Sequence, residues 1–387
     1  MMRDTLRGLV AVIFAWLVLC EHGFVMVVGT NYNYKDALKK SLLFLEAQRS
    51  GKLPASRRIP WRDDSALDDG KLAGLDLTGG YYDAGDNVKY GLPMAFTVTT
   101  LAWSALAYSE ELQAAGELSN LHSAIRWGTD FFLKTAARKN SLYVQDELLW
   151  AATWLYIATR RDVYYKYITE EAITASVAEF SWDLKYPGAQ VLLSGINITG
   201  EGGEQNFKTQ ADNFVCSILP ESPFNQVYMS PGGLIHLRDG ANTQYVTSTA
   251  FLFSVYSDML SRNKQTVKCG NQEFQPSRLM QFAKQQMDYL LGNNPKGRSY
   301  MVGFGVNPPK QPHHRGASVP VLARSETVNC GMSFMQWLNK DQPNPNELTG
   351  AIVGGPDRYD NFNDKRWLSA MLEPCTYINS PCSWHPG

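Results

Sequence analysis

The sequence has no excess of charge of either sign: 36 lysine and arginine residues stand against 37 aspartate and glutamate residues in a chain of 387. Proteins that bind nucleic acid or an anionic membrane surface concentrate positive charge. Nothing in this composition therefore favours either partner. An apolar run long enough to cross a bilayer, about 20 residues, is also lacking, because the N-terminal run over residues 9–20 ends at Glu21.

The N-terminal segment has the composition of a secretory signal peptide. Arg3 and Arg7 flank the start of the apolar run, and Gly29 is a small residue beyond it. This order of basic, apolar and small residues predicts a signal peptide over residues 1–29. Residues 30–387 then form one secreted domain without membrane contact. The sequon that starts at Asn197 predicts a glycosylated surface loop, although such triplets also arise by chance.

Cysteine is scarce, and its number is odd after export. Cys20 leaves with the signal peptide, and five cysteines remain: Cys216, Cys269, Cys330, Cys375 and Cys382. In an oxidising compartment at least one of them is unpaired or bonded outside the chain, and the sequence leaves the pairing open. None of their spacings is the close one of a metal site, so we expect no metal.

Helical periodicity dominates the chain, and no strand ladder stands out. Apolar residues recur at helical spacing in eight segments: 36–48, 93–112, 119–134, 147–159, 170–180, 206–217, 244–260 and 277–291. Residues 244–260 are apolar on nearly all sides, which predicts a buried inner helix. The pattern predicts an all-α array of antiparallel helical hairpins.

Three long connections are rich in glycine, proline, aspartate and aromatic residues: 49–92, 292–320 and 340–366. Long structured loops on a rigid scaffold usually carry function. Aromatic side chains in such loops either pack in the core or stack on sugar rings, and composition does not separate the two uses.

The first loop, residues 76–87, places Asp83 and Asp86 three residues apart in a glycine-containing turn. Two carboxylates at this spacing can hold one water, as the base of an inverting glycosidase requires. The same residues also occur in ordinary turns, and aspartate-rich loops can bind calcium.

The second loop, residues 299–315, ends in His313, His314 and Arg315, which can hydrogen-bond sugar hydroxyls. Adjacent histidines can also bind metal, but no third ligand lies at helical spacing from them. The third loop, residues 362–380, contains Asp364 and Glu373. Taken alone, Glu373 is as well explained as a surface residue.

Together the three loops resemble glycoside hydrolase family 9, in particular the plant secreted endo-β-1,4-glucanases, from about residue 32 to residue 380. The resemblance implies an (α/α)6 barrel of six inner and six outer helices. It also implies the residue roles: Asp86 as general base with Asp83 helping to hold the water, Glu373 as general acid with Asp364 as its supporting carboxylate, and His313, Arg315, Tyr82 and Trp61 as residues that contact the sugar.

The chain departs from the family pattern at several points. Segments that relatives keep apart are fused between Gln145 and Asp146, and the family's sugar-binding Asp-Pro-x-x-Asp-His motif is absent with the missing stretch. Ser369 and Cys375 replace commoner residues, and the sequence after Asn379 does not follow the family. We therefore expect an incomplete barrel that lacks helices.

The sequence as a whole predicts an inverting cellulase of the extracellular space or cell wall, acting on β-1,4-glucan as a monomer without cofactor. A second hypothesis is a catalytically impaired glucan-binding or misfolded splice-type variant of the same family. A third is a helical protein in which Asp83 and Asp86 bind calcium.

Overall fold

The computed structural model describes residues 32–136, 145–171, 175–196, 207–322, 326 and 328–382. The predicted signal peptide and the sequon at Asn197 lie outside these residues. Residues Asn33–Gly387 form one compact unit.

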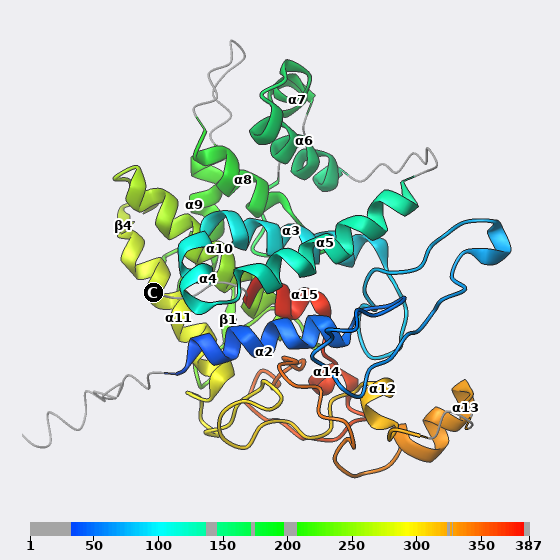
Figure 1. The fold of residues 1–387 in the computed structure, drawn as a ribbon. Coiled ribbons are helices and arrows are strands. Elements are labelled where there is room, and N and C mark those ends of the chain that lie inside the picture. The colour runs from blue at the N-terminus through cyan, green and yellow to red at the C-terminus, as the bar shows by residue number, and fades with distance from the viewer. Residues whose placement is uncertain are drawn as a thin grey trace, which may run out of the picture. The chain divides into compact units, whose positions relative to one another are not determined.

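Helices make up most of the regular structure (Figure 1). The α-helices are α2 (Tyr34–Ala47), α3 (Gly91–Ala107), α4 (Ser109–Ala115), α5 (Leu118–Thr135), α6 (Gln145–Thr159), α7 (Asp162–Lys166), α8 (Tyr186–Ser194), α9 (Phe207–Ile218), α10 (Thr243–Arg262), α11 (Pro276–Leu291), α12 (Arg315–Ser318), α13 (Cys330–Met332), α14 (Ser369–Leu372) and α15 (Thr376–Asn379). Short irregular helices are η1 (Lys71–Ala73), η2 (Tyr167–Glu171), η3 (Ser333–Leu338) and η4 (Ser380–Cys382).

The described residues also form two short antiparallel ladders, which the sequence pattern did not reveal. Strand β1 (Tyr228–Met229) pairs with β2 (Ile235–His236), and β3 (Val267–Cys269) pairs with β4 (Gln272–Phe274). Two or three residues are too few for a period-of-two pattern to be recognised.

Two of the predicted helices were wrong in extent or place. The segment 93–112 is split, because Tyr108 leaves the helical conformation (φ −127°, ψ 35°) and its hydroxyl donates to Ser254 Oγ at 3.0 Å. Within 170–180, only Glu170 and Glu171 are helical, at the end of η2, and the described residues 175–180 form no helix. There Glu179 instead binds Arg238 and accepts from Ser181. The helix comes later as α8, with a proline in its first turn, where proline is favoured.

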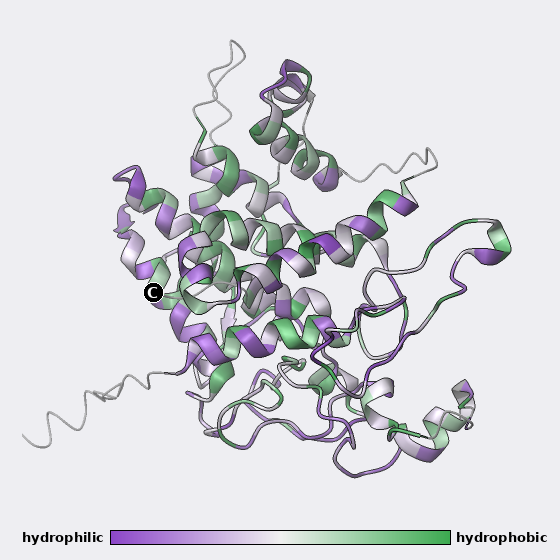
Figure 2. Ribbon diagram, viewed as in Figure 1, coloured by the Kyte–Doolittle hydropathy of each residue, from purple (hydrophilic) through white to green (hydrophobic). Residues whose placement is uncertain are grey.

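The predicted inner helix is confirmed as α10. Its buried side chains lie on all sides, and Val246, Ala250 and Phe251 have no exposed surface. Helix α10 packs against α11, as α3 packs against α5 and α8 against α9. Figure 2 shows α2, α5 and α11 alternating between the hydrophilic and the hydrophobic colour, as helices with one face in solvent do.

The C-terminal helix α15 contacts α2, α3 and α10 (red in Figure 1). Asn379 at its end is fully buried: its amide nitrogen donates to Ser41 Oγ and to the Gly350 carbonyl, and its amide oxygen accepts from Ile352 N. A buried side chain that uses all these groups holds the third loop rigidly against the helical core.

One disulfide is present among the described residues, Cys216–Cys269, which joins α9 to β3. Cys375 and Cys382 are buried free thiols. None of the helices among the described residues is both long enough and apolar enough to cross a membrane.

Candidate active site

Main-chain hydrogen bonds join the three loops pairwise. Thr376 N of the third loop donates to the Asp83 carbonyl at 2.9 Å, His313 N of the second donates to the Leu372 carbonyl at 2.8 Å, and Arg315 N donates to the Gly85 carbonyl at 3.0 Å. Each loop is thus bonded to both of the others. The structure brings the three predicted motifs together although up to about 290 residues of sequence separate them.

The first loop can approach the second only because residue 85 is glycine. A Cβ atom there would lie 2.2 Å from the His313 carbonyl oxygen and 2.9 Å from His314 Cα, far inside van der Waals contact. The turn is closed by Asp83 N, which donates to the Val88 carbonyl at 2.9 Å, and Asn87 adopts a left-handed conformation (φ 57°). Asparagine tolerates that region better than most residues.

Asp83 and Glu373 interact electrostatically in partly buried positions. Burial, and secondarily the charge of Glu373, raise the pKa of Asp83 to about 7. One oxygen of Asp83, Oδ1, is buried without a hydrogen-bond partner, so its charge is poorly compensated. Burial also raises the pKa of Glu373; the charge of His313 opposes this effect and that of Asp86 adds to it. These couplings place Asp83, Glu373, His313 and Asp86 in one electrostatic cluster.

Asp86 differs from these two carboxyls because it is exposed to solvent. Two carboxyl environments therefore coexist in the site. One is wet and the other is desolvated, a division that often separates a base from an acid.

His313 is held in one tautomer. Its Nδ1 lies 2.7 Å from the Arg366 carbonyl oxygen, which can only accept, so Nδ1 carries the proton and donates. Arg366 itself is 1% exposed and donates to the carbonyls of Trp337, Leu338, Lys340 and Gln342 and to Asn344 Oδ1. This arginine, which the sequence did not single out, holds the 337–344 segment against the site.

The Arg315 guanidinium lies over the Phe334 ring, 4.6 Å from its centroid, and donates to Ser333 Oγ at 3.1 Å. Helix η3, which supplies both partners, therefore sets the direction of this predicted sugar ligand.

Three other predicted site residues have structural partners. Asp364 accepts from Lys310 N at 2.8 Å and from Gln311 N at 3.0 Å, so its carboxylate binds the second loop directly. Tyr82 is only 7% exposed and its hydroxyl donates to Ser65 Oγ at 2.9 Å, which leaves little of its ring for contact with a sugar. Trp61 Nε1 donates to the Glu347 carbonyl at 3.1 Å, and its half-buried ring lies edge-on to His314.

A buried pair links the first two loops and was missed by sequence reasoning. Gln48, at the end of α2, is fully buried, and its Oε1 lies 2.8 Å from His314 Nε2. The two residues are 266 positions apart. The only sequence signal was the adjacency of His314 to His313.

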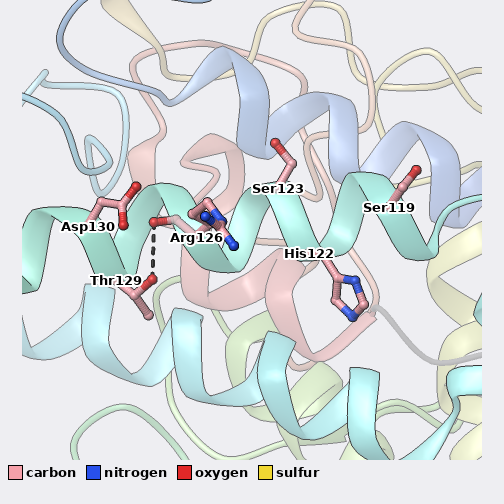
Figure 3. Close-up of a pocket in the computed structure, with 6 residues that line it drawn as sticks. All are labelled: Ser119, His122, Ser123, Arg126, Thr129 and Asp130. Carbon is pink, nitrogen blue, oxygen red and sulfur yellow. Dashed lines mark hydrogen bonds between the residues drawn. The ribbon is translucent and has the colours of Figure 1, made fainter.

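A hollow of 350 Å³ adjoins the third loop. Its lining includes Ala370 and Met371, just before Glu373, together with His236, Arg358 and Tyr359. Tyr359 is 62% exposed, so its ring is accessible to a flat ligand. A larger hollow of 680 Å³ lies along α5 (Figure 3); its six lining residues, Ser119, His122, Ser123, Arg126, Thr129 and Asp130, all belong to that helix and include no predicted site residue.

Among the described residues, no group of three or more histidine, cysteine, aspartate or glutamate side chains is arranged to hold a metal ion.

The family model for glycosyl hydrolase family 9 matches residues 34–145 and 143–385. Endoglucanase 8 of Oryza sativa subsp. japonica is 55% identical over 465 residues, covering 96% of this chain and 93% of the relative. Endoglucanase 16 of Arabidopsis thaliana is 51% identical and covers 98% and 96%.

Solved structures give the same picture. The endoglucanase of the termite Nasutitermes takasagoensis superposes with a TM-score of 0.75 at 29% identity, covering 92% of this chain and 98% of that one. Endoglucanase CelQ of Clostridium thermocellum, complexed with cellobiose and cellotriose, superposes with a TM-score of 0.74 at 26% identity, covering 91% and 69%. These neighbours confirm the predicted all-α fold class, the (α/α)6 barrel.

The comparisons also bear on the predicted departures. The two matched stretches meet at residues 143–145, which agrees with the predicted fusion between Gln145 and Asp146. The stretch aligned with Endoglucanase 8 is 465 residues long against 387 in this chain, so the relative contains segments that this chain lacks. The expectation that the likeness ends at Asn379 was wrong, because the family match extends to residue 385.

Proposed function

Because this chain belongs to glycosyl hydrolase family 9, we propose that it hydrolyses internal β-1,4-glucosidic bonds of cellulose or a related β-glucan by a single, inverting displacement. One observation carries the proposal: main-chain hydrogen bonds hold the three loops together, and these loops contain two carboxyls in different environments. Asp86 is exposed to solvent, whereas Glu373 is partly buried and its pKa is raised.

In this mechanism Glu373 is the general acid. A raised pKa keeps the carboxyl protonated closer to neutral pH, where it can donate to the departing glycosidic oxygen. Asp86 is the general base: it lies where water is available and removes the proton of the water that attacks the opposite face of the sugar. Asp83, which precedes Asp86 by three residues in the same loop, helps to hold that water.

His313 and Arg315 are the proposed sugar ligands. With Nδ1–H given to the Arg366 carbonyl, His313 has Nε2 as its remaining ring nitrogen, and that atom accepts from a hydroxyl while the imidazole is neutral. The fixed guanidinium of Arg315 donates to hydroxyl oxygens. Tyr359, exposed beside the hollow at the third loop, offers a ring face for a neighbouring glucose unit.

We propose further that the protein is exported to the extracellular space or cell wall. The basic, apolar and small residues of positions 1–29 support this, and so does the disulfide Cys216–Cys269, since disulfides persist in oxidising compartments.

The Asp86→Asn variant tests the function. It removes the charge that activates water but keeps the size of the side chain, so hydrolysis of a soluble β-1,4-glucan should fall by about 10²–10⁴-fold, while binding of a cello-oligosaccharide, measured by calorimetry, stays near the wild-type level. Asp130→Asn, an exposed aspartate on α5 outside the three loops, is the matched control and should retain full activity. Retention of more than about a tenth of the activity in Asp86→Asn would place the base elsewhere.

A second candidate function, glucan binding without turnover, is favoured by one observation: the break in the family match at residues 143–145. The same two assays separate the candidates. Affinity for cello-oligosaccharide together with no hydrolysis by the unsubstituted chain would support the binding protein over the enzyme.

A further inference from the structure

Gln48 holds the main chain on both sides of Asp83. Its carbonyl accepts from Tyr82 N at 2.8 Å. Its side-chain nitrogen Nε2 donates to the Tyr82 carbonyl at 3.2 Å and to the Ala84 carbonyl at 2.9 Å. Two carbonyl acceptors fix which end of the amide faces the loop, so Oε1 points away from it.

The other end of the Gln48 amide is bound by a neutral histidine. His314 Nδ1 accepts from Ala317 N at 3.0 Å and caps α12, which leaves the ring proton on Nε2 to donate to Gln48 Oε1 at 2.8 Å. Burial, with the nearby charges of Arg62 and His313, lowers the pKa of His314 to about 3. The imidazole therefore stays neutral at ordinary pH, and its donor and acceptor roles do not exchange.

We propose that Gln48 and His314 are positioning residues that set the water-holding loop of Asp83 and Asp86 against the loop of His313 and Arg315. This inference rests on the proposed function for its catalytic consequence. Both side chains are buried, at 0% and 2% exposure. They act through the main chain of residues 82–84 and do not touch substrate themselves.

The physical consequence follows from how the first loop is held. The Gly85 carbonyl accepts from Arg315 N, and Gly85 lies against the His313 carbonyl. Loss of the Gln48 side-chain bonds would leave the buried Tyr82 carbonyl and the partly buried Ala84 carbonyl without this donor. Both carbonyls would then turn toward water and move the loop. A shift of about 1 Å in a reacting group can cost about 10²-fold in rate. Because the side chains proposed to contact the sugar are themselves unchanged, kcat should fall while KM changes little.

Two substitutions of His314 separate its link to Gln48 from its capping of α12. His314→Gln retains a donor near the Nε2 position and loses the cap, whereas His314→Asn retains an acceptor that suits an N-cap and loses the donor to Gln48. We expect His314→Gln to keep kcat within about threefold of wild type and His314→Asn to lose at least about tenfold. Equal losses, or a larger loss in His314→Gln, would overturn the proposal.

Gln48→Met has a matched control in the same protein. Gln286 is also a buried glutamine, 1% exposed, whose Nε2 donates to the Gly233 carbonyl and whose Oε1 accepts from Ile235 N, and it bonds to none of the three loops. Gln48→Met and Gln286→Met should lower the melting temperature similarly. Only Gln48→Met should lower kcat. An equal effect of both substitutions on kcat would show that Gln48 has only a structural role.

A readout without turnover keeps this test apart from that of the function. Carboxyl ¹³C NMR titrates Asp83, which is surrounded by Glu373, Cys375 and Tyr377 and has a pKa of about 7 in the closed loop. In Gln48→Met the loop opens to water and this pKa should fall toward 3.8, whereas in Gln286→Met it should not change. An unchanged Asp83 titration in Gln48→Met refutes the link. If the unsubstituted chain does not hydrolyse glucan, the proposed function fails while this titration still decides the positioning role.

Discussion

Replacement of Asp83 by asparagine should stabilise the protein, although it removes a proposed catalytic group. In the folded chain, burial raises the pKa of Asp83 to about 7 from an ordinary value of 3.8, and one carboxylate oxygen has no partner. A difference of this size between folded and unfolded states corresponds to about 4 kcal/mol. The ionised folded protein is less stable by that amount than it would be without the charge.

The direction with pH follows from proton binding. Between about pH 4 and pH 7 the unfolded chain has lost the Asp83 proton while the folded chain retains it, so the unfolded state binds fewer protons and stability falls as pH rises. Below pH 4 both states are protonated and the cost is absent. Asparagine cannot ionise, and Asp83→Asn should therefore match the wild type near pH 4 and exceed it by up to about 4 kcal/mol above pH 7.

Urea unfolding at a series of pH values between 4 and 8 measures this difference. Asp86→Asn is the control: Asp86 is exposed, and its substitution should change stability little at any of these pH values. If Asp83→Asn were no more stable than wild type at pH 8, or if its advantage were the same at pH 4 and pH 8, the assignment of a desolvated, poorly compensated carboxyl at this position would be refuted. A gain in stability with a loss of rate is the usual trade-off at a functional site.

Three further outcomes are expected. The first product released from a β-linked substrate should be the α-anomer, and early accumulation of the β-anomer in proton NMR would contradict single displacement with a water held by Asp86. Substitution of both Cys216 and Cys269 by alanine should lower the free energy of unfolding by about 4 kcal/mol, because the disulfide closes a loop with a sequence separation of 53. Urea unfolding measures this loss, and a value below about 1 kcal/mol would show that the loop is already restricted in the unfolded chain. Insertion of the missing segment of rice Endoglucanase 8 between Gln145 and Asp146 should raise both the melting temperature and the glucanase rate. Burial of each apolar side chain that the segment covers stabilises the fold by about 1.5–3 kcal/mol. Equal melting temperatures and rates with and without the segment would mean that the shortened barrel is complete without it.

Much of the candidate site was predictable because its motifs are long and local. The first loop contains both aspartates and the glycine that lets it approach the second loop, within four consecutive residues. The helix that became α10 was predictable for a similar reason, since apolar residues on all its sides are typical of a helix surrounded by protein. Such patterns involve only residues that are close in sequence, so they can be recognised without knowledge of a distant partner.

Other features depended on partners that no local pattern identifies. Asp364 was expected to support Glu373, and in the structure its carboxylate binds the amides of Lys310 and Gln311. Tyr82 was expected to contact sugar, yet it is buried with its hydroxyl on Ser65. The sequence shows that these side chains are polar and aromatic, but tertiary packing sets the direction in which each one points.

The sequence by itself determined the family, the all-α class and the approximate place of the fusion before Asp146, because each depends on residue order along the chain. Only the tertiary structure decided which cysteines pair, which carboxyl is desolvated, and that Gln48 and His314 meet across 266 residues. The physical reason is that a hydrogen bond, a disulfide or a pKa depends on the atoms within a few ångströms in space. The sequence determines which atoms are present, and the tertiary structure determines which of them become neighbours.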